Sequence, residues 1–241
     1  MFKRYRFALA AALVSFIAIA SSLAVRVVAA TAPASEEEIC DPLADYALGM
    51  EDYPRAVKLH QEVIRKHPGL ALAYYHLGFA YGVLGDHDQE LIDYQKAVEL
   101  GLSDWALFLN LGRLYLESNH LEQASDAFRL AALLAPYRPE THYDLGLVYE
   151  RLGRFHKAEQ EILLSLRLEP EQADARNTLG VIYAEERNFA RAHEEWADLK
   201  RSYPDYTPAT ANLAILEQVE RGRTSGQARD VQRLSGFAQT P

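Results

Sequence analysis

The stretch of sequence that decides the fold runs from Pro139 to Gln172 and reads PETHYDLGLVYERLGRFHKAEQEILLSLRLEPEQ. It contains two amphipathic segments, joined by a short turn at Gly153 and ended by Pro170. The same pattern occurs thirty-four residues earlier and thirty-four residues later. One pair of short helices cannot bury its own apolar face, so we expect the copies to stack on one another.

This period divides the chain into five equal windows, which are 37–70, 71–104, 105–138, 139–172 and 173–206. In the last four windows the first helix carries a Leu-Gly pair and then a Tyr, as in Leu145, Gly146 and Tyr149. Glycine inside a helix costs about 1 kcal/mol relative to alanine, so its recurrence predicts a close approach of the second helix. The second helix places one bulky residue at the same position of every window: His60, Tyr94, Phe128, Ile162 and Trp196.

With this period and these residues, the chain resembles the tetratricopeptide repeat family over residues 37–206. The resemblance implies an all-α superhelix of helix-turn-helix units, with a concave face that binds a peptide or protein. The first window departs from the pattern, because Leu43-Ala44 and Ala47 stand where the others have Leu-Gly and Tyr. We interpret it as a degenerate terminal repeat. Glu90 replaces the small residue of the second helix in window 71–104, which predicts looser packing there.

The N-terminus has the order of a secretory signal. Basic residues at positions 3, 4 and 6 precede an uncharged run from Phe7 to Val25, and small residues follow it. Cleavage after Ala20 or Ala30 would suit these small residues. The alternative is an uncleaved anchor, because nineteen helical residues reach about 28 Å, close to the thickness of a bilayer core. In both cases we expect the rest of the chain outside the cytoplasmic membrane, as a periplasmic or other extracytoplasmic protein.

The remaining segments are shorter. Residues 31–36 are expected to form a linker, residues 207–221 a capping helix over the last repeat, and residues 222–241 a flexible tail.

Charge and cysteine content restrict the partners. Without residues 1–30, which hold four basic side chains and no acidic one, the formal charge falls from −9 to −13. This argues against nucleic acid as a ligand, and against a membrane surface except through an uncleaved N-terminal segment. Cys40 is the only cysteine, so no intramolecular disulfide forms, and we interpret its thiol as incidental.

No catalytic motif is present in the sequence. It lacks a phosphate-binding glycine loop, an HExxH motif and a Gly-x-Ser-x-Gly motif. We therefore expect no enzyme activity, no cofactor and no metal, and we interpret the acidic turn around His87 as an ordinary polar turn.

A protein or peptide partner remains, and the family resemblance places it on the first helices. Helical spacing from the Leu-Gly pair predicts an aromatic and aliphatic stripe edged by charges. Its members are Tyr75, Phe79, Leu109, Arg113, Leu116, Tyr143, Leu147, Glu150, Arg151, Asn177 and Val181. The alternative for each of them is packing against a neighbouring repeat.

Two functions follow from these features. The first is an exported scaffold that binds an apolar peptide or helix of a partner during assembly of a cell-envelope complex. The second is a structural organiser, anchored at the membrane, that associates with itself through its convex or terminal faces.

Overall fold

The computed structural model describes residues 40–224, with side chains up to residue 221. All regular structure in this part of the chain is α-helical, in eleven helices and without a strand. The predicted signal or anchor, the linker 31–36 and the tail beyond residue 224 lie outside the described residues. Between residues 40 and 224, no helix is both long enough and apolar enough to cross a membrane.

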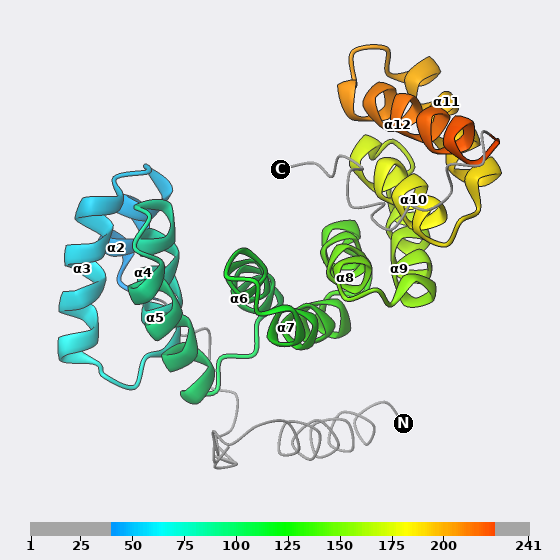
Figure 1. Cartoon of the computed structure of the whole chain (residues 1–241). Coiled ribbons are helices and arrows are strands. Elements are labelled where there is room, and N and C mark those ends of the chain that lie inside the picture. Colours follow the sequence, from blue (N-terminus) through cyan, green and yellow to red (C-terminus); the bar gives the residue numbers. More distant parts are fainter. Residues whose placement is uncertain (1–39, 225–241) are drawn as a thin grey trace, which may run out of the picture. The chain divides into compact units, whose positions relative to one another are not determined.

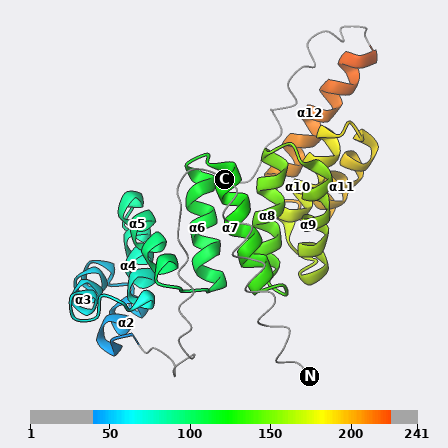
Figure 2. The ribbon, with the colours of Figure 1, turned by 90° about the horizontal axis from the view of Figure 1, so that it is seen from below.

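The described helices fall into two compact units, divided between Ser103 and Asp104. The N-terminal unit contains α2 (Pro42–Gly49), α3 (Tyr53–Lys66), α4 (Ala71–Val83) and α5 (His87–Glu99). Figures 1 and 2 show these four helices side by side. Each helix pair comes from one sequence window, so this unit consists of two stacked helical hairpins.

The C-terminal unit contains three further hairpins and a final helix. The hairpins are α6 (Trp105–Glu117) with α7 (Leu121–Leu134), α8 (Pro139–Arg151) with α9 (Phe155–Leu168), and α10 (Ala173–Glu185) with α11 (Phe189–Ser202). The final helix, α12 (Thr207–Thr224), packs against α11 and α10 and extends beyond the predicted range 207–221. Figure 1 shows α12 beside these two helices.

Helix ends are fixed by local chemistry. The side chains of Asp41, Asp52, Asp86, Asp104 and Asn188 accept hydrogen bonds from backbone N–H groups at the starts of α2, α3, α5, α6 and α11. In four of the five hairpins the second helix ends two residues before a proline, as α9 does before Pro170.

The turns inside the hairpins use left-handed backbone. Gly85, Asn119 and Gly153 adopt positive φ angles there, as their residue types predict. Glu51 and Arg187 occupy the equivalent turns with φ of 59° and 61°. Their residue types gave no sign of this, because charged side chains seldom adopt such angles.

The recurring glycines allow the helices of a pair to approach closely. A Cβ at Gly112 would lie 2.5 Å from the Phe128 ring, and one at Gly146 would lie 2.6 Å from Ile162. Gly180 faces Trp196 in the same way. The bulky residues of the second helices therefore fill the space that the glycines leave.

The pair α4–α5 is not loosened by Glu90, and that prediction was wrong. A Cβ at Gly78 would lie 2.7 Å from the Tyr94 ring, so this pair approaches as closely as the others. Glu90 is buried, and its carboxylate occupies the space over Gly82, where a Cβ would lie 2.6 Å from it. A second glycine one turn after Gly78 accommodates the larger side chain.

Candidate functional site

The candidate site is the face predicted on the first helix of each hairpin. On α4 this face is apolar and consists of Tyr75, Phe79 and Val83, which we call the α4 apolar face. Phe79 is 36% exposed and Val83 50% exposed, and Tyr75 is partly buried. These residues recur at intervals of four, so they lie along one side of the helix.

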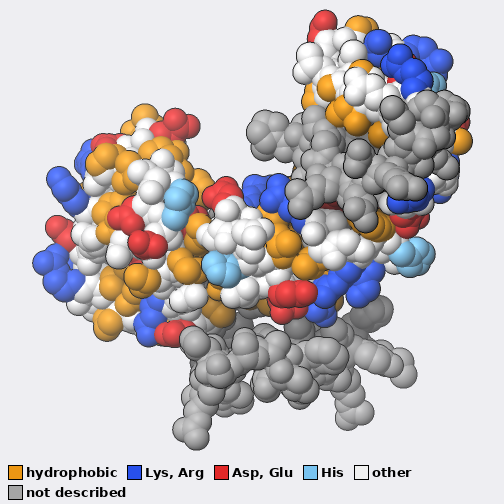
Figure 3. All heavy atoms as spheres, viewed as in Figure 1, with side chains coloured by type: hydrophobic (Ala, Val, Ile, Leu, Met, Phe, Trp, Pro, Cys, Tyr) orange, Lys and Arg blue, Asp and Glu red, His pale blue; other side chains and the backbone are white. Residues whose placement is uncertain are grey.

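Aromatic contacts hold two members of the α4 apolar face in place. The Tyr75 ring lies 5.9 Å from the Tyr94 ring of α5, and the Phe79 ring lies 6.4 Å from the Tyr53 ring at the start of α3. Rings at such centroid separations contribute beyond the area that they bury. The face therefore combines fixed side chains with open apolar surface. In Figure 3 hydrophobic side chains reach the surface of the N-terminal unit in several patches between charged residues.

The corresponding face of α6 is occupied differently. Leu109 and Leu116 are buried, so their contacts are internal and they offer little surface to a partner. Arg113 is exposed, but its Nε donates a hydrogen bond of 2.7 Å to Oδ2 of Asp144 on α8. This ion pair joins two successive first helices of the C-terminal unit.

The face of α8 is mixed. Tyr143 and Leu147 are partly buried, Glu150 is buried, and Arg151 is exposed. Burial raises the pKa of Asp144 on the same helix, and the guanidinium of Arg113 opposes part of that rise. Arg113 therefore compensates a carboxylate that would otherwise lie in a poorly solvated position.

On α10 the predicted residues are internal. Val181 is buried, and Asn177 is fully buried, with its Oδ1 accepting a hydrogen bond of 2.9 Å from Nδ2 of Asn212 on α12. The backbone oxygen of Asn177 also accepts from Nε1 of Trp196, at 3.3 Å. Asn177 therefore joins α10 to α11 and α12, and Val181 is internal, which is the packing alternative.

Among the predicted residues, those with surface to offer are therefore Tyr75, Phe79, Arg113, Tyr143, Leu147 and Arg151. Whether a partner contacts them stays a prediction. The structure adds Val83 to this set. It also adds Leu43 and Tyr46 on α2 and Met50 directly after that helix, which are 50%, 60% and 61% exposed.

Sequence reasoning also missed one polar cluster. Cys40, Asp45, His60 and His76 each place one possible metal ligand within 4.8 Å of the others. Burial lowers the pKa of His60 to about 4 and lowers that of His76 as well, so both rings are neutral near pH 7. The signal available in the sequence was His60, since its position holds an aromatic or aliphatic residue in the other four windows.

Comparisons with known proteins agree with this architecture. The family model described as tetratricopeptide repeat matches residues 42–104, 109–167 and 143–207, more than half of the chain. No curated protein matches the sequence. Among solved structures, YrrB, described as a TPR protein with an unusual peptide-binding site, is similar at 23% identity with a TM-score of 0.67. That match covers 69% of this chain and 86% of YrrB.

Two further structures show the same fold. The MamA protein is similar at 18% identity with a TM-score of 0.61, covering 82% of this chain and 94% of MamA. A tetratricopeptide repeat protein from Parabacteroides merdae is similar at 19% identity with a TM-score of 0.66, covering 76% and 77%. At these identities the similarity concerns the fold.

Proposed function

Because the chain belongs to the tetratricopeptide repeat family, we propose that it is a non-enzymatic interaction scaffold that binds an apolar peptide or helix of another protein. The observation that carries this proposal is the α4 apolar face, where Phe79 and Val83 expose apolar surface beside the fixed ring of Tyr75. Aromatic side chains held by their neighbours are common anchors of protein interfaces, because little conformational entropy is lost when they bind.

Charge supports an apolar or basic partner segment. The body of the chain carries a formal charge of −13 without residues 1–30, which disfavours acidic ligands and nucleic acid. On the α4 apolar face itself no side chain is charged, so recognition there depends on apolar contact. The YrrB structure provides a precedent for peptide binding by this fold.

The proposed location is extracytoplasmic. It rests on the basic start, the apolar run Phe7–Val25 and the small residues after it. There the scaffold would serve assembly of a cell-envelope complex, and its only link to the membrane would be an uncleaved N-terminal segment. N-terminal sequencing of the mature protein would distinguish a cleaved signal from an anchor.

Alanine substitutions test the assigned face. The purified full-length chain would be applied to an array of apolar peptides, tiled from proteins of the same envelope, beside the double variant Tyr75→Ala, Phe79→Ala. We expect the double variant to lose at least about 10-fold in affinity, because anchor residues each contribute about 1–2 kcal/mol or more.

The matched control is Ile92→Ala. Ile92 lies in the same unit and is 55% exposed, but it belongs to α5, a second helix. Peptide binding unchanged in the double variant, or weakened equally by Ile92→Ala, would remove the assignment of this face.

The second candidate function is self-association, which the exposed residues of α2 favour. Leu43 and Tyr46 lie on α2, the first helix of the described residues, and Met50 directly follows it; all three expose apolar surface that a second copy of the chain could cover. Light scattering of the full-length chain and of the variant Tyr46→Glu would test it. This function requires a concentration-dependent oligomer that Tyr46→Glu dissociates, and a strictly monomeric chain would contradict it.

A further inference from the structure

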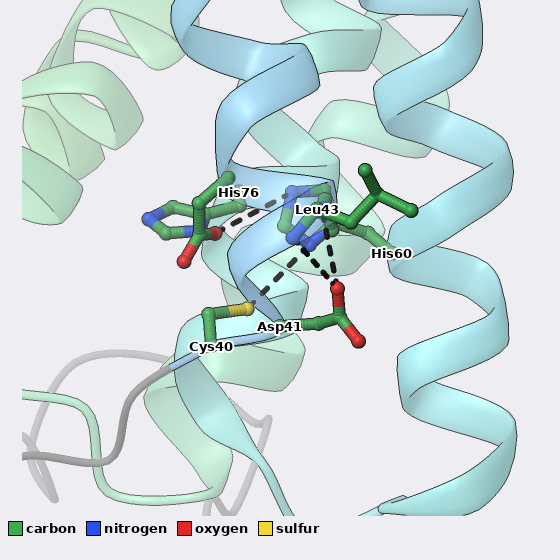
Figure 4. A network of polar contacts seen from close by, with 7 residues as sticks. Cys40, Asp41, Leu43, His60 and His76 are labelled. Atoms are coloured by element: carbon green, nitrogen blue, oxygen red, sulfur yellow. Dashed lines mark hydrogen bonds and ion pairs between the residues drawn. The ribbon is translucent and has the colours of Figure 1, made fainter.

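Four side chains that can bind a metal lie together in the N-terminal unit. Three of them come from α2, α3 and α4, and the fourth lies just before α2. Cys40 directly precedes the N-cap of α2, Asp45 lies in the first turn of α2, His60 lies in the middle of α3, and His76 lies in α4. Figure 4 shows the side chains of Cys40 and His60 facing each other, with His76 close by. Residues separated by up to thirty-six positions in the sequence thus meet at one point.

Close contacts already link the four side chains. Sγ of Cys40 lies 3.6 Å from Nδ1 of His60, and Nδ1 of His76 lies 3.0 Å from Oδ1 of Asp45. The same oxygen of Asp45 lies 4.0 Å from Nε2 of His60. The donors are one thiol, two imidazoles and one carboxylate, and all three chemical types are ligands of zinc.

His60 is the member that ordinary packing explains least. Its side chain is 0% exposed, and its Nε2 has no hydrogen-bond partner among the described residues. A buried polar atom in that state costs about 1–3 kcal/mol. The four other hairpins fill this position with Tyr94, Phe128, Ile162 or Trp196, none of which leaves a buried nitrogen or oxygen unsatisfied.

We propose that Cys40, Asp45, His60 and His76 form a structural zinc site that joins α2, α3 and α4. Zinc suits the set because it accepts sulfur, nitrogen and oxygen ligands together and imposes no geometry from its d electrons. Copper(II) binds such ligands more tightly in general, but its preferred tetragonal geometry and its reactivity with thiols make it a poorer match.

The distances are close to those that zinc requires. Bond lengths of about 2.0–2.3 Å in a tetrahedron place ligand atoms about 3.3–3.6 Å apart. The Cys40–His60 and His76–Asp45 distances of 3.6 Å and 3.0 Å lie near this range. All four ligand atoms lie within 4.8 Å of one another, so the longer separations must shorten by at most roughly 1 Å, which side-chain rotation can provide.

Four protein ligands complete the coordination of zinc, so the site is structural and no position remains for a substrate. On binding, the Cys40 thiol transfers its proton to solvent, and the thiolate and the Asp45 carboxylate together balance the two charges of the cation. Where α2, α3 and α4 meet, five alanines are buried beside Val63, with partly buried larger apolar side chains around them; the alanines are Ala44, Ala47, Ala56, Ala73 and Ala80. The cation would add the cross-link that larger side chains provide in the other hairpins.

Cobalt titration tests the site directly. The full-length chain, freed of metal by a chelator and kept reduced, would be titrated with Co²⁺ as the probe. We expect one Co²⁺ per chain, with a thiolate-to-cobalt charge-transfer band and the intense visible bands of tetrahedral cobalt, both abolished by one equivalent of Zn²⁺.

Variants assign the ligands. Cys40→Ser should abolish the charge-transfer band, and His76→Gln should weaken binding at least about 100-fold, since even outer-shell partners change metal affinity about 10–100-fold. Asp45→Asn, whose side chain is partly exposed, provides a second ligand variant with little risk to folding. The control is His67→Ala, an exposed histidine of the same unit, which should change nothing.

The proposal fails if the chain takes up no cobalt, or if the bound cobalt shows no thiolate band. It also fails if His67→Ala weakens binding as much as His76→Gln does, which would indicate adventitious surface binding. Circular dichroism of each metal-free variant would confirm that a loss of binding does not come from unfolding. None of these results depends on whether the α4 apolar face binds a partner.

Discussion

The first hairpin of the N-terminal unit and the hairpins of the C-terminal unit fill equivalent positions with different chemistry. In the C-terminal unit Phe128, Ile162 and Trp196 pack over glycines of the facing helix. In the first hairpin the same position holds His60, within a group of a thiol, a second imidazole and a carboxylate. The repeat architecture therefore accepts either an apolar contact or a polar cluster at this position of the second helix.

The exposed faces of the two units also differ. The α4 apolar face of the N-terminal unit carries Tyr75, Phe79 and Val83 and no charge. In the C-terminal unit the Arg113–Asp144 ion pair joins α6 to α8, and Arg151 of α8 is exposed. Apolar surface for a partner is thus found on α4 of the N-terminal unit. In the C-terminal unit, the corresponding faces of α6, α8 and α10 are used largely for contacts within the unit.

The largest effect is expected from removing the largest buried ring of the C-terminal unit. Trp196→Ala deletes a fully buried side chain that also donates a hydrogen bond to the backbone of Asn177. We expect the free energy of unfolding to fall by about 3–5 kcal/mol, as for other buried aromatic residues. Urea unfolding followed by circular dichroism would measure it. If Trp196→Ala lowered the free energy of unfolding no more than His60→Ala does, the contrast between the α10–α11 and α2–α3 hairpins would be contradicted.

A buried acid of the N-terminal unit should make stability depend on pH. Asp93 is buried and forms no hydrogen bond or ion pair with another described residue, and burial raises its pKa from 3.8 to about 6. Between these values the folded chain binds more protons than the unfolded chain, so this contribution to stability falls as pH rises through the window. Asp93→Asn should therefore add about 3 kcal/mol at pH 7, and the gain should vanish as the pH falls below the unfolded pKa.

Unfolding free energies of this variant at a series of pH values would check the prediction. Asp88→Asn, at an exposed position of the same helix, is the control and should preserve the pH dependence of the unaltered chain. An unchanged slope in Asp93→Asn would show that another group is responsible.

The glycines of the two units should differ in tolerance to a methyl group. At Gly112 an added Cβ meets the Phe128 ring at 2.5 Å, whereas at Gly82 it meets the carboxylate of Glu90, the far end of an unbranched side chain, at 2.6 Å. Gly112→Ala should lose about 1–2 kcal/mol, because overpacking exceeds the gain in helix propensity. Gly82→Ala should lose less, because the Glu90 side chain can rotate whereas the Phe128 ring is enclosed. Thermal unfolding of both variants would measure the two losses of stability. Equal losses would mean that the Glu90 side chain is held as firmly as the Phe128 ring.

The smallest effect is expected from making the first hairpin resemble the others. With a chelator present, His60→Leu should raise the free energy of unfolding by about 1 kcal/mol, because it removes an unsatisfied buried nitrogen at nearly constant volume. With Zn²⁺ present, the unaltered chain should become more stable and the variant should not respond. A destabilised variant under chelation would indicate that the polar cluster is well satisfied without a cation.

Much of the fold was predictable, because period and residue type act locally. The Leu-Gly pairs, the small residues and the prolines placed the helices, and Gly85 and Gly153 marked turns by their freedom to adopt positive φ. Glu51 and Arg187 were missed because neighbouring structure imposes their conformation. Burial was harder to predict, since the contacts of Asn177 and Leu109 depend on how neighbouring helices pack.

The polar cluster was missed for a related reason. Its four members come from three helices and the segment before them, with no recognisable ligand spacing along the chain. Only the departure of His60 from the aromatic and aliphatic pattern could have drawn attention to it. The four side chains come together only when the helices stack, so no single stretch of sequence predicts the cluster.

The most direct test of the proposed function compares the two units in living cells. A photo-crosslinking amino acid would replace Phe79 on the α4 apolar face, Arg151 on the corresponding face of the C-terminal unit, or Ile92 on α5. The account predicts a discrete covalent adduct with another protein from position 79, and little or none from positions 151 and 92. Adducts from position 92 or 151 in the absence of one from position 79 would contradict it.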